Sequence, residues 1–111
     1  MMVRIYHNPR CSKSRQTLAL IEEKGITPDV IHYLDTPPTP QELKEILGML
    51  GMAPEDILRK KEAREEGIAD LRGDDLIEAL CAHPRAIERP IVINGKKAAL
   101  GRPPESVLEI L

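Results

Sequence analysis

The sequence predicts a mixed α/β protein in which a strand–helix–strand half and a strand–strand–helix half are separated by helices. Three observations predict this class. Apolar residues between about 39 and 83 recur at helical spacing. An Asn-Gly pair, the strongest short hairpin signal, lies near the carboxyl end. Runs with the composition of strands lie before and after the helical stretch, at 3–6, 30–34, 91–93 and 97–100.

The first half of the chain is predicted to form a parallel βαβ unit. The β-branched and aromatic run 3–6 predicts a strand, and Pro9 lies beyond its end. A helix is expected over 12–24, where apolar residues share one face and Gly25 ends the pattern. The run 30–34 predicts the next strand. The connection is long enough for a parallel crossover.

The helical stretch opens with a capping signal. Thr39 fits the N-cap, Pro40 fits the first helical position, and Glu42 completes a capping box. Apolar residues then recur at helical spacing through Leu50.

Two further helical segments are predicted beyond it. Pro54 opens one through Arg59, and 74–82 forms the other, which ends before Pro84. The Lys- and Glu-rich residues 60–70 between them are expected to be a solvated stretch.

The last third of the chain predicts a hairpin followed by a helix. The strands at 91–93 and 97–100 flank Asn94-Gly95, two residues that tolerate a positive φ. A final helix is expected over 105–111. The complete order is thioredoxin-like, with a helical insertion at about 39–83 between the two halves.

The length and composition fit a single globular domain over 1–111. The hydrophobic fraction of 41% and charged fraction of 31% argue against disorder. Tyr6 and Tyr33 are the only Phe, Tyr or Trp residues, so an aliphatic core is expected. The shortage of aromatic residues also argues against a base-stacking platform for single-stranded nucleic acid.

Charge and hydropathy disfavour nucleic-acid and membrane partners. The formal net charge is −2, and no run approaches the roughly 18 apolar residues that span a bilayer. The N-terminal residues contain no apolar export segment. We therefore expect a cytoplasmic monomer in which Cys11 and Cys81 are reduced thiols.

Cys11 lies at the predicted junction of the first strand and the first helix. Free backbone N–H groups and the positive end of the helix dipole favour an anion there, so the position should lower the thiol pKa. The alternative is a small buried hydrophobe, which the polar flanks disfavour. The potential cations that flank Cys11 are His7, Arg10, Lys13 and Arg15.

Cys11 and Ser14 form a C-x-x-S motif, the dithiol redox spacing with the second sulfur replaced. Ser14 shares a helical face with Cys11 and can donate a hydrogen bond to its sulfur. Such a site attacks an electrophile but cannot close a local disulfide, so it needs an external or a distant thiol. Cys81 is the internal candidate, although its apolar helix favours a core thiol.

Arginines near element ends provide candidate anion ligands, because their planar fork suits tetrahedral oxyanions. They are Arg59, Arg89 and Arg102, although each of them alone is more typical of a surface arginine. Arg89-Pro90, before a buried strand, is a candidate cis bond. No metal site is expected, because the His and Cys residues lack paired ligand spacing.

Several motifs occur together in the order found in a known family. They are YHNPRCSKSR at 6–15, ILRKKE at 57–62, ERPIV at 88–92 and GRPPE at 101–105. With them the chain resembles, over about 3–111, the glutaredoxin-coupled arsenate reductase (ArsC) family of the thioredoxin superfamily. The short length and the first and last motifs are most similar to its YfgD-type subgroup.

The resemblance implies an arsenate reductase. Cys11 would attack arsenate as a thiolate, with His7 helping to lower its pKa and Ser14 assisting; Pro90 would be cis. Glutathione, a co-substrate, would attack the arsenic–sulfur intermediate, and glutaredoxin would resolve the mixed disulfide without any bound cofactor. The implied oxyanion ligands are Arg59, Arg89 and Arg102.

Two alternatives stay open at this point. The first is a thiol oxidoreductase of the same family that acts on another substrate, since Arg10 stands where well-characterised members carry a small residue. The second is a Spx-like redox regulator that binds RNA polymerase. Ser14 disfavours the regulator, because it breaks the usual C-x-x-C switch.

Overall fold

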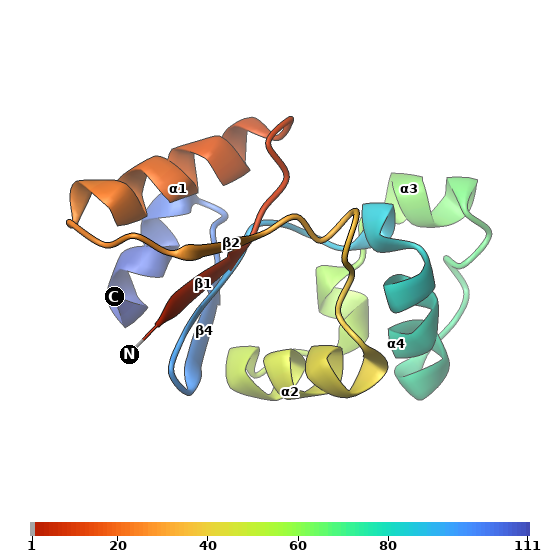
Figure 1. Ribbon diagram of the computed structural model, residues 1–111. Helices are drawn as coiled ribbons and strands as arrows, with labels where there is room; N and C mark the ends of the chain where they lie inside the picture. The colour runs from red at the N-terminus through yellow and green to blue at the C-terminus, as the bar shows by residue number, and fades with distance from the viewer. Residues whose placement is uncertain (1) are drawn as a thin grey trace. The chain divides into compact units, whose positions relative to one another are not determined.

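The computed structural model describes residues 2–111 (Figure 1). Contacts group the chain into two compact units. The first contains the residues up to Tyr33 together with Arg89–Leu111, and the second is Leu34–Glu88. The helical insertion predicted at about 39–83 lies within the second unit. No helix within residues 2–111 combines the length and apolar character needed to cross a membrane.

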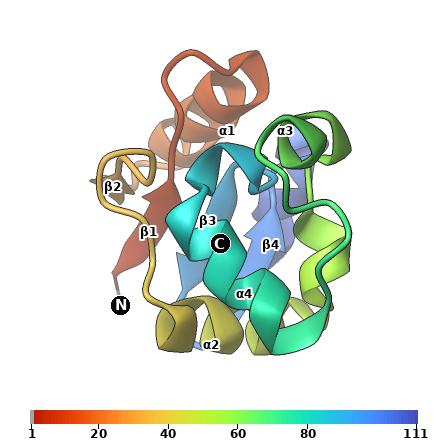
Figure 2. The same ribbon diagram turned by 90° about the vertical axis from the view of Figure 1, so that its right-hand side faces the viewer.

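The first unit contains a four-stranded sheet in the order β2-β1-β3-β4. β1 runs parallel to β2 and antiparallel to β3, and β3 runs antiparallel to β4 (Figure 2). This topology confirms the predicted βαβ and ββα halves and the thioredoxin-like fold. The elements of the unit are β1 (Val3–Tyr6), α1 (Ser12–Glu23), β2 (Asp29–Ile31), β3 (Ile91–Asn94), β4 (Lys97–Leu100) and the 3₁₀ helix η3 (Pro104–Ile110).

One face of the sheet is covered by α1 and η3, which pack against each other (Figure 1). Side chains alternate along a strand, so Val3 and Ile5 of β1 share this face. They are buried with Ile21 of α1, Val92 of β3 and Val107 of η3. This aliphatic cluster fixes α1 on the sheet and thereby fixes the loop that leads into it.

The second strand is shorter than predicted. It ends at Ile31 rather than at residue 34, because its partner β1 ends at Tyr6, which pairs with Ile31. One more hydrogen bond follows, from the His7 N–H to the Ile31 carbonyl at 2.8 Å.

The hairpin is present, but its turn lies one residue later than predicted. Asn94 pairs with Lys97 inside the ladder, so Gly95 and Lys96 form the turn. Gly95 has a φ of 64°, and no non-glycine residue in the described chain has a positive φ. This is the pattern of a type II′ turn, which needs glycine only at its first central position.

The second unit contains five helical elements. They are α2 (Pro40–Leu50), η1 (Pro54–Ile57), α3 (Lys60–Glu65), α4 (Gly73–Ala82) and η2 (Pro84–Ala86). α4 packs against α2 and η1 through its apolar face. The capping box is confirmed: the Thr39 hydroxyl accepts from the Glu42 N–H at 3.1 Å, and the Glu42 carboxylate accepts from the Thr39 N–H at 2.9 Å.

One prediction for this unit was incomplete and another was wrong. Residues 60–70 are largely exposed, as expected, but they include the helix α3 and bury the two apolar side chains of Ala63 and Ile68. The segment opened by Pro54 does not run helically to Arg59, because Leu58 is extended and forms a β-bridge with Ile87.

The last helix is also of a different type from the one predicted. η3 is a 3₁₀ helix over Pro104–Ile110, rather than an α-helix over 105–111. It still buries Pro104 and Val107, and Val107 belongs to the aliphatic cluster on the sheet.

The end of β4 approaches α1 so closely that only glycine fits there. A Cβ built on Gly101 lies 2.7 Å from Cγ of Pro90 and 3.0 Å from Cγ2 of Thr17, and closer still to the Thr17 hydroxyl. The Gly101 N–H donates to the Pro90 carbonyl at 2.9 Å. The segment that leads to Arg102 is therefore held against both α1 and the start of β3.

We expect Gly101→Ala to lower the free energy of unfolding by about 1–3 kcal/mol, because the new methyl overpacks Thr17 and Pro90. Urea unfolding followed by circular dichroism measures this change. Gly48→Ala is the matched control: Gly48 lies within α2, and a Cβ there meets nothing within 4 Å. That change should stabilise the protein by about 0.5–1 kcal/mol. Equal effects of the two substitutions would contradict the close approach at Gly101.

Candidate active site

The loop between β1 and α1 is held by one hydrogen bond within its backbone and by two from side chains. The Cys11 N–H donates to the Asn8 carbonyl at 3.0 Å, and the Arg10 N–H donates to Oδ1 of Asn8 at 3.0 Å. From α1, Nη1 of Arg15 donates to the Pro9 carbonyl at 2.9 Å. Cys11 is thus placed at the N-cap of α1, the position that Ser, Thr, Asp or Asn commonly occupies.

The pKa of the Cys11 thiol is lowered. Burial raises it, but hydrogen bonds from the Ser14 backbone N–H, the Arg89 side chain and the Lys13 backbone N–H outweigh that effect, and the charge of Arg89 adds to them. The N-terminus of α1 and the charge of Arg89 therefore favour the thiolate form of Cys11.

Ser14 is completely buried and reaches the sulfur through its backbone rather than its hydroxyl. Its Oγ accepts a hydrogen bond from the Asn8 N–H at 3.0 Å and lies 2.6 Å from Nδ1 of His7. The predicted donation from the Ser14 hydroxyl to the sulfur is replaced by this network, which ties the helix to the preceding loop.

His7 does not behave as one of the cations expected around the thiol. Burial lowers its pKa, and the nearby His32 and Arg15 lower it further. The His7 and His32 rings meet edge to face with centroids 6.0 Å apart. A neutral His7 can hold Ser14 in place, but it does not supply positive charge to Cys11.

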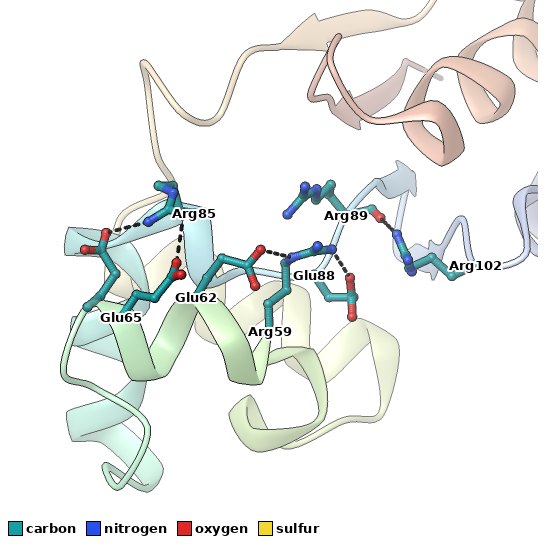
Figure 3. A network of polar contacts seen from close by, with 8 residues as sticks. Arg59, Glu62, Glu65, Arg85, Glu88, Arg89 and Arg102 are labelled. Carbon is teal, nitrogen blue, oxygen red and sulfur yellow. Dashed lines mark hydrogen bonds and ion pairs between the residues drawn. The ribbon is translucent and has the colours of Figure 1, made fainter.

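The other side of the site comes from the distant end of the chain. Nη1 of Arg102 donates to the Arg89 carbonyl at 3.1 Å (Figure 3). The Arg89–Pro90 peptide bond, which the sequence singled out, is cis, and so is Arg102–Pro103. Nε of Arg89 is buried and has no hydrogen-bond partner within residues 2–111. Arg89 therefore lowers the pKa of the Cys11 thiol and also carries a buried Nε–H without a partner among the described residues.

Arg59 belongs to the second unit and is already paired there. Nε of Arg59 lies 3.3 Å from Oε2 of Glu62, and Nη1 lies 2.9 Å from Oε1 of Glu88 (Figure 3). Its side chain is 23% exposed. The structure therefore brings His7, Cys11, Ser14, Arg89 and Arg102 together within the first unit, while Arg59 lies in the second.

Cys81 has the opposite character from Cys11. Burial, followed by the nearby Glu42 and Glu78 carboxylates, raises its pKa to about 11. It is protonated at neutral pH and is a poor nucleophile. The described residues contain no group of three or more His, Cys, Asp or Glu side chains suited to holding a metal ion.

Three residues of the site were missed by the sequence reasoning. Asn8 closes the active loop, and Thr17 and Gly101 set the distance between α1 and the end of β4. Asn-Pro is a turn-forming pair and was the available signal for Asn8. Thr17 and Gly101 carry no local signal, because their contact exists only in the folded chain.

These features define a class: a thioredoxin-like protein with one low-pKa thiol at the N-terminus of its first helix and an arginine beside it. The ArsC family model matches residues 6–110. The chain is 48% identical to an arsenate reductase of Haemophilus influenzae, over 100% of both chains. It is also 48% identical to the uncharacterized protein YfgD of Escherichia coli, over 98% of this chain and 96% of YfgD.

The solved structures agree with the sequence comparisons. The arsenate reductase from Vibrio cholerae superposes with a TM-score of 0.91 at 50% identity, covering 100% of this chain and 98% of that one. The chain belongs to the ArsC family.

Arg89→Gln should raise the pKa of Cys11, because it removes both a charge-assisted hydrogen bond and a nearby positive charge. We expect the rate of Cys11 alkylation by iodoacetamide at neutral pH to fall by about three- to tenfold, after allowance for solvent screening of the partly buried arginine. The pH dependence of alkylation, measured in a Cys81→Ser background, reports the pKa of Cys11 alone.

Arg10→Gln is the matched control, since it removes the same charge from the residue next to Cys11. Its effect on the pKa of Cys11 should be much smaller than that of Arg89→Gln. Equal shifts in the two variants would show that general positive charge, rather than the Arg89 hydrogen bond, lowers the pKa.

Proposed function

We propose that this protein is an arsenate reductase in which Cys11 is the nucleophile and external thiols supply the electrons. One observation carries the assignment: Arg89 lowers the pKa of the Cys11 thiol, and Arg102 donates a hydrogen bond to the Arg89 carbonyl. A thiolate at a helix N-terminus is thereby placed beside forked cations, in a chain whose relatives include named arsenate reductases.

The arrangement suits an anionic electrophile. Arsenate, like a phosphate ester, carries roughly −1.5 to −2 charges near neutral pH, so an approaching thiolate is repelled. Arg89 and Arg102 offset this repulsion with positive charge and forked donors. Arg59 is included on the family resemblance; its planar fork is suited to the same role.

The remaining side chains of the site position the nucleophile. The neutral His7 ring and the Asn8 N–H hold the Ser14 hydroxyl, and Ser14 presents its backbone N–H to the sulfur. We assign His7 and Ser14 to keeping the first turn of α1 and the loop in register, so that Cys11 is a thiolate at neutral pH.

The source of electrons follows from the thiols present. Reduction of arsenate to arsenite takes two electrons: arsenate and two thiols give arsenite, one disulfide and water. Ser14 removes a local partner for Cys11, and the raised pKa of Cys81 disfavours it as a second nucleophile. Glutathione as co-substrate, with glutaredoxin reducing the mixed disulfide, completes the proposed cycle without a bound cofactor.

Cys11→Ser should abolish arsenate-dependent NADPH oxidation in the presence of glutathione, glutaredoxin and glutathione reductase, because serine is not ionised at neutral pH. Cys81→Ser is the matched control and should retain most of the activity. Activity that survives Cys11→Ser would overturn the role of Cys11. An inactive wild-type protein with a reactive Cys11 would point instead to a thiol oxidoreductase acting on another substrate.

Arg102→Ala should raise KM for arsenate by about tenfold, since a charge-assisted hydrogen bond contributes about 1.5–3 kcal/mol and Arg102 is exposed. Arg59→Lys tests the second unit: it keeps the charge but loses the fork, and we expect a smaller increase in KM. Steady-state kinetics with varied arsenate measures both changes. An unchanged KM in either variant would remove that arginine from the oxyanion site.

A further inference from the structure

Thr17 is a polar residue whose side chain is completely buried in the middle of α1. Its hydroxyl donates to the Lys13 carbonyl, one turn earlier in the helix, at 2.7 Å. A β-branched side chain and a hydroxyl that competes for a helix carbonyl make threonine a weak helix former. An apolar residue would therefore serve packing alone at least as well, and the hydroxyl of Thr17 is the feature that needs an explanation.

The Lys13 carbonyl belongs to the same peptide unit as the Ser14 N–H. Ser14 is the third residue of α1, so its N–H has no acceptor within the helix. The free N–H groups of a helix point toward its N-terminal end, where Cys11 occupies the N-cap. A hydroxyl that donates to the carbonyl of a peptide unit also polarises the N–H of that unit, because hydrogen bonds in a chain strengthen one another.

The Lys13–Ser14 peptide is also the one with the strongest favourable effect on the thiol. Burial raises the pKa of Cys11, and among the effects that lower it the Ser14 backbone N–H is the largest, followed by the Arg89 side chain and the Lys13 backbone N–H. The hydroxyl of Thr17 is thus bonded to the peptide unit whose N–H matters most to Cys11.

Packing keeps the Thr17 hydroxyl on this carbonyl. Gly101 approaches so closely that a Cβ built on it would contact the Thr17 hydroxyl and lie 3.0 Å from Cγ2 of Thr17. Both branches of the side chain therefore lie against the end of β4, which restricts rotation about χ1. The hydrogen bond to Lys13 is a fixed feature of the folded helix.

We infer that Thr17 is a positioning residue for the nucleophile: its hydroxyl holds and polarises the Lys13–Ser14 peptide, whose N–H stabilises negative charge on Cys11. The inference rests on the proposed function in taking Cys11 as the nucleophile, and it adds a residue that acts on the thiol through the helix backbone.

A second route from Thr17 to the site runs through packing. Arg89 is the charged side chain that acts on Cys11 from another element, and it precedes Pro90, which pairs with Gly101 through a 2.9 Å hydrogen bond. A change of shape at Thr17 would act on Arg89 through this pair, without any part played by the hydroxyl.

Two substitutions separate these routes. Thr17→Val keeps the branched shape and removes the hydroxyl, whereas Thr17→Ser keeps the hydroxyl and removes the methyl. Both are made in a Cys81→Ser background, and circular dichroism shows whether each variant is folded. The rate of Cys11 alkylation by iodoacetamide is then measured as a function of pH.

Thr17→Val should move the midpoint of the pH profile to higher pH. Below the midpoint, Cys11 should react about two- to threefold more slowly than in the wild-type protein, as expected when one charge-assisted bond in a cooperative chain is weakened. The limiting rate at high pH, where Cys11 is fully ionised, should stay unchanged. Thr17→Ser should keep the wild-type midpoint, because serine donates to the same carbonyl.

Two further variants complete the set. Thr17→Ala removes both groups without adding bulk, and its midpoint should match that of Thr17→Val. Thr27→Val is the matched control: Thr27 is exposed and precedes β2, whose first residue Asp29 pairs with Arg4, whereas Cys11 follows the opposite end of β1. It should leave the whole profile unaltered.

The positioning role is overturned if Thr17→Val keeps the wild-type midpoint, or if Thr17→Ser raises the midpoint as much as Thr17→Val does, which would assign the effect to packing. It is equally overturned if Thr17→Val lowers only the limiting rate, or if Thr27→Val reproduces the shift.

These measurements contain no arsenate, so they separate the positioning role from the proposed function. If the wild-type protein does not reduce arsenate but the midpoint depends on the Thr17 hydroxyl, the proposed function fails and the positioning role stands. If arsenate is reduced and Thr17→Val has the wild-type midpoint, the positioning role fails and the proposed function stands.

Discussion

The stabilisation of one thiolate by a helix N-terminus organises the catalytic half of this molecule. The backbone N–H groups of Ser14 and Lys13 act on the Cys11 sulfur only because α1 begins at Ser12 and stays fixed on the sheet. The aliphatic cluster under α1 provides that fixation. Arg89, at the start of β3, reaches the same sulfur because the sheet places β3 beside β1. The chemistry of the site therefore depends on burial of apolar side chains some distance from it.

Much of this fold was predictable because the relevant signals are local. The capping box at Thr39 and Glu42, the βαβ order and the hairpin all follow from residues near one another in the chain. The errors arise where a residue that is distant in the sequence determines the local structure. β2 ends where its partner β1 ends, and Leu58 is extended because it pairs with Ile87. Ala63 is buried by tertiary contacts, which its charged neighbours in the sequence do not indicate.

The site shows the same division between local and distant information. A low pKa for Cys11 was predicted correctly, but mainly from the wrong charges. His7 is held neutral by burial, and the arginine that acts on the sulfur is Arg89, which is remote in the sequence. The residues that flank Cys11 indicate that its position favours an anion. They do not indicate which side chain, distant in the sequence, lies close to the sulfur in the folded protein. Glycine at position 101 is likewise understood only through Thr17 and Pro90.

The buried Ser14 also bears on how this chain can evolve. A single change to cysteine would create the familiar dithiol motif, yet the Ser14 oxygen accepts from Asn8 and lies against His7 in a site with no exposed surface. A larger sulfur with weaker hydrogen bonds would disturb the loop that holds Cys11. Introduction of a second thiol at this position therefore requires coordinated changes at several positions.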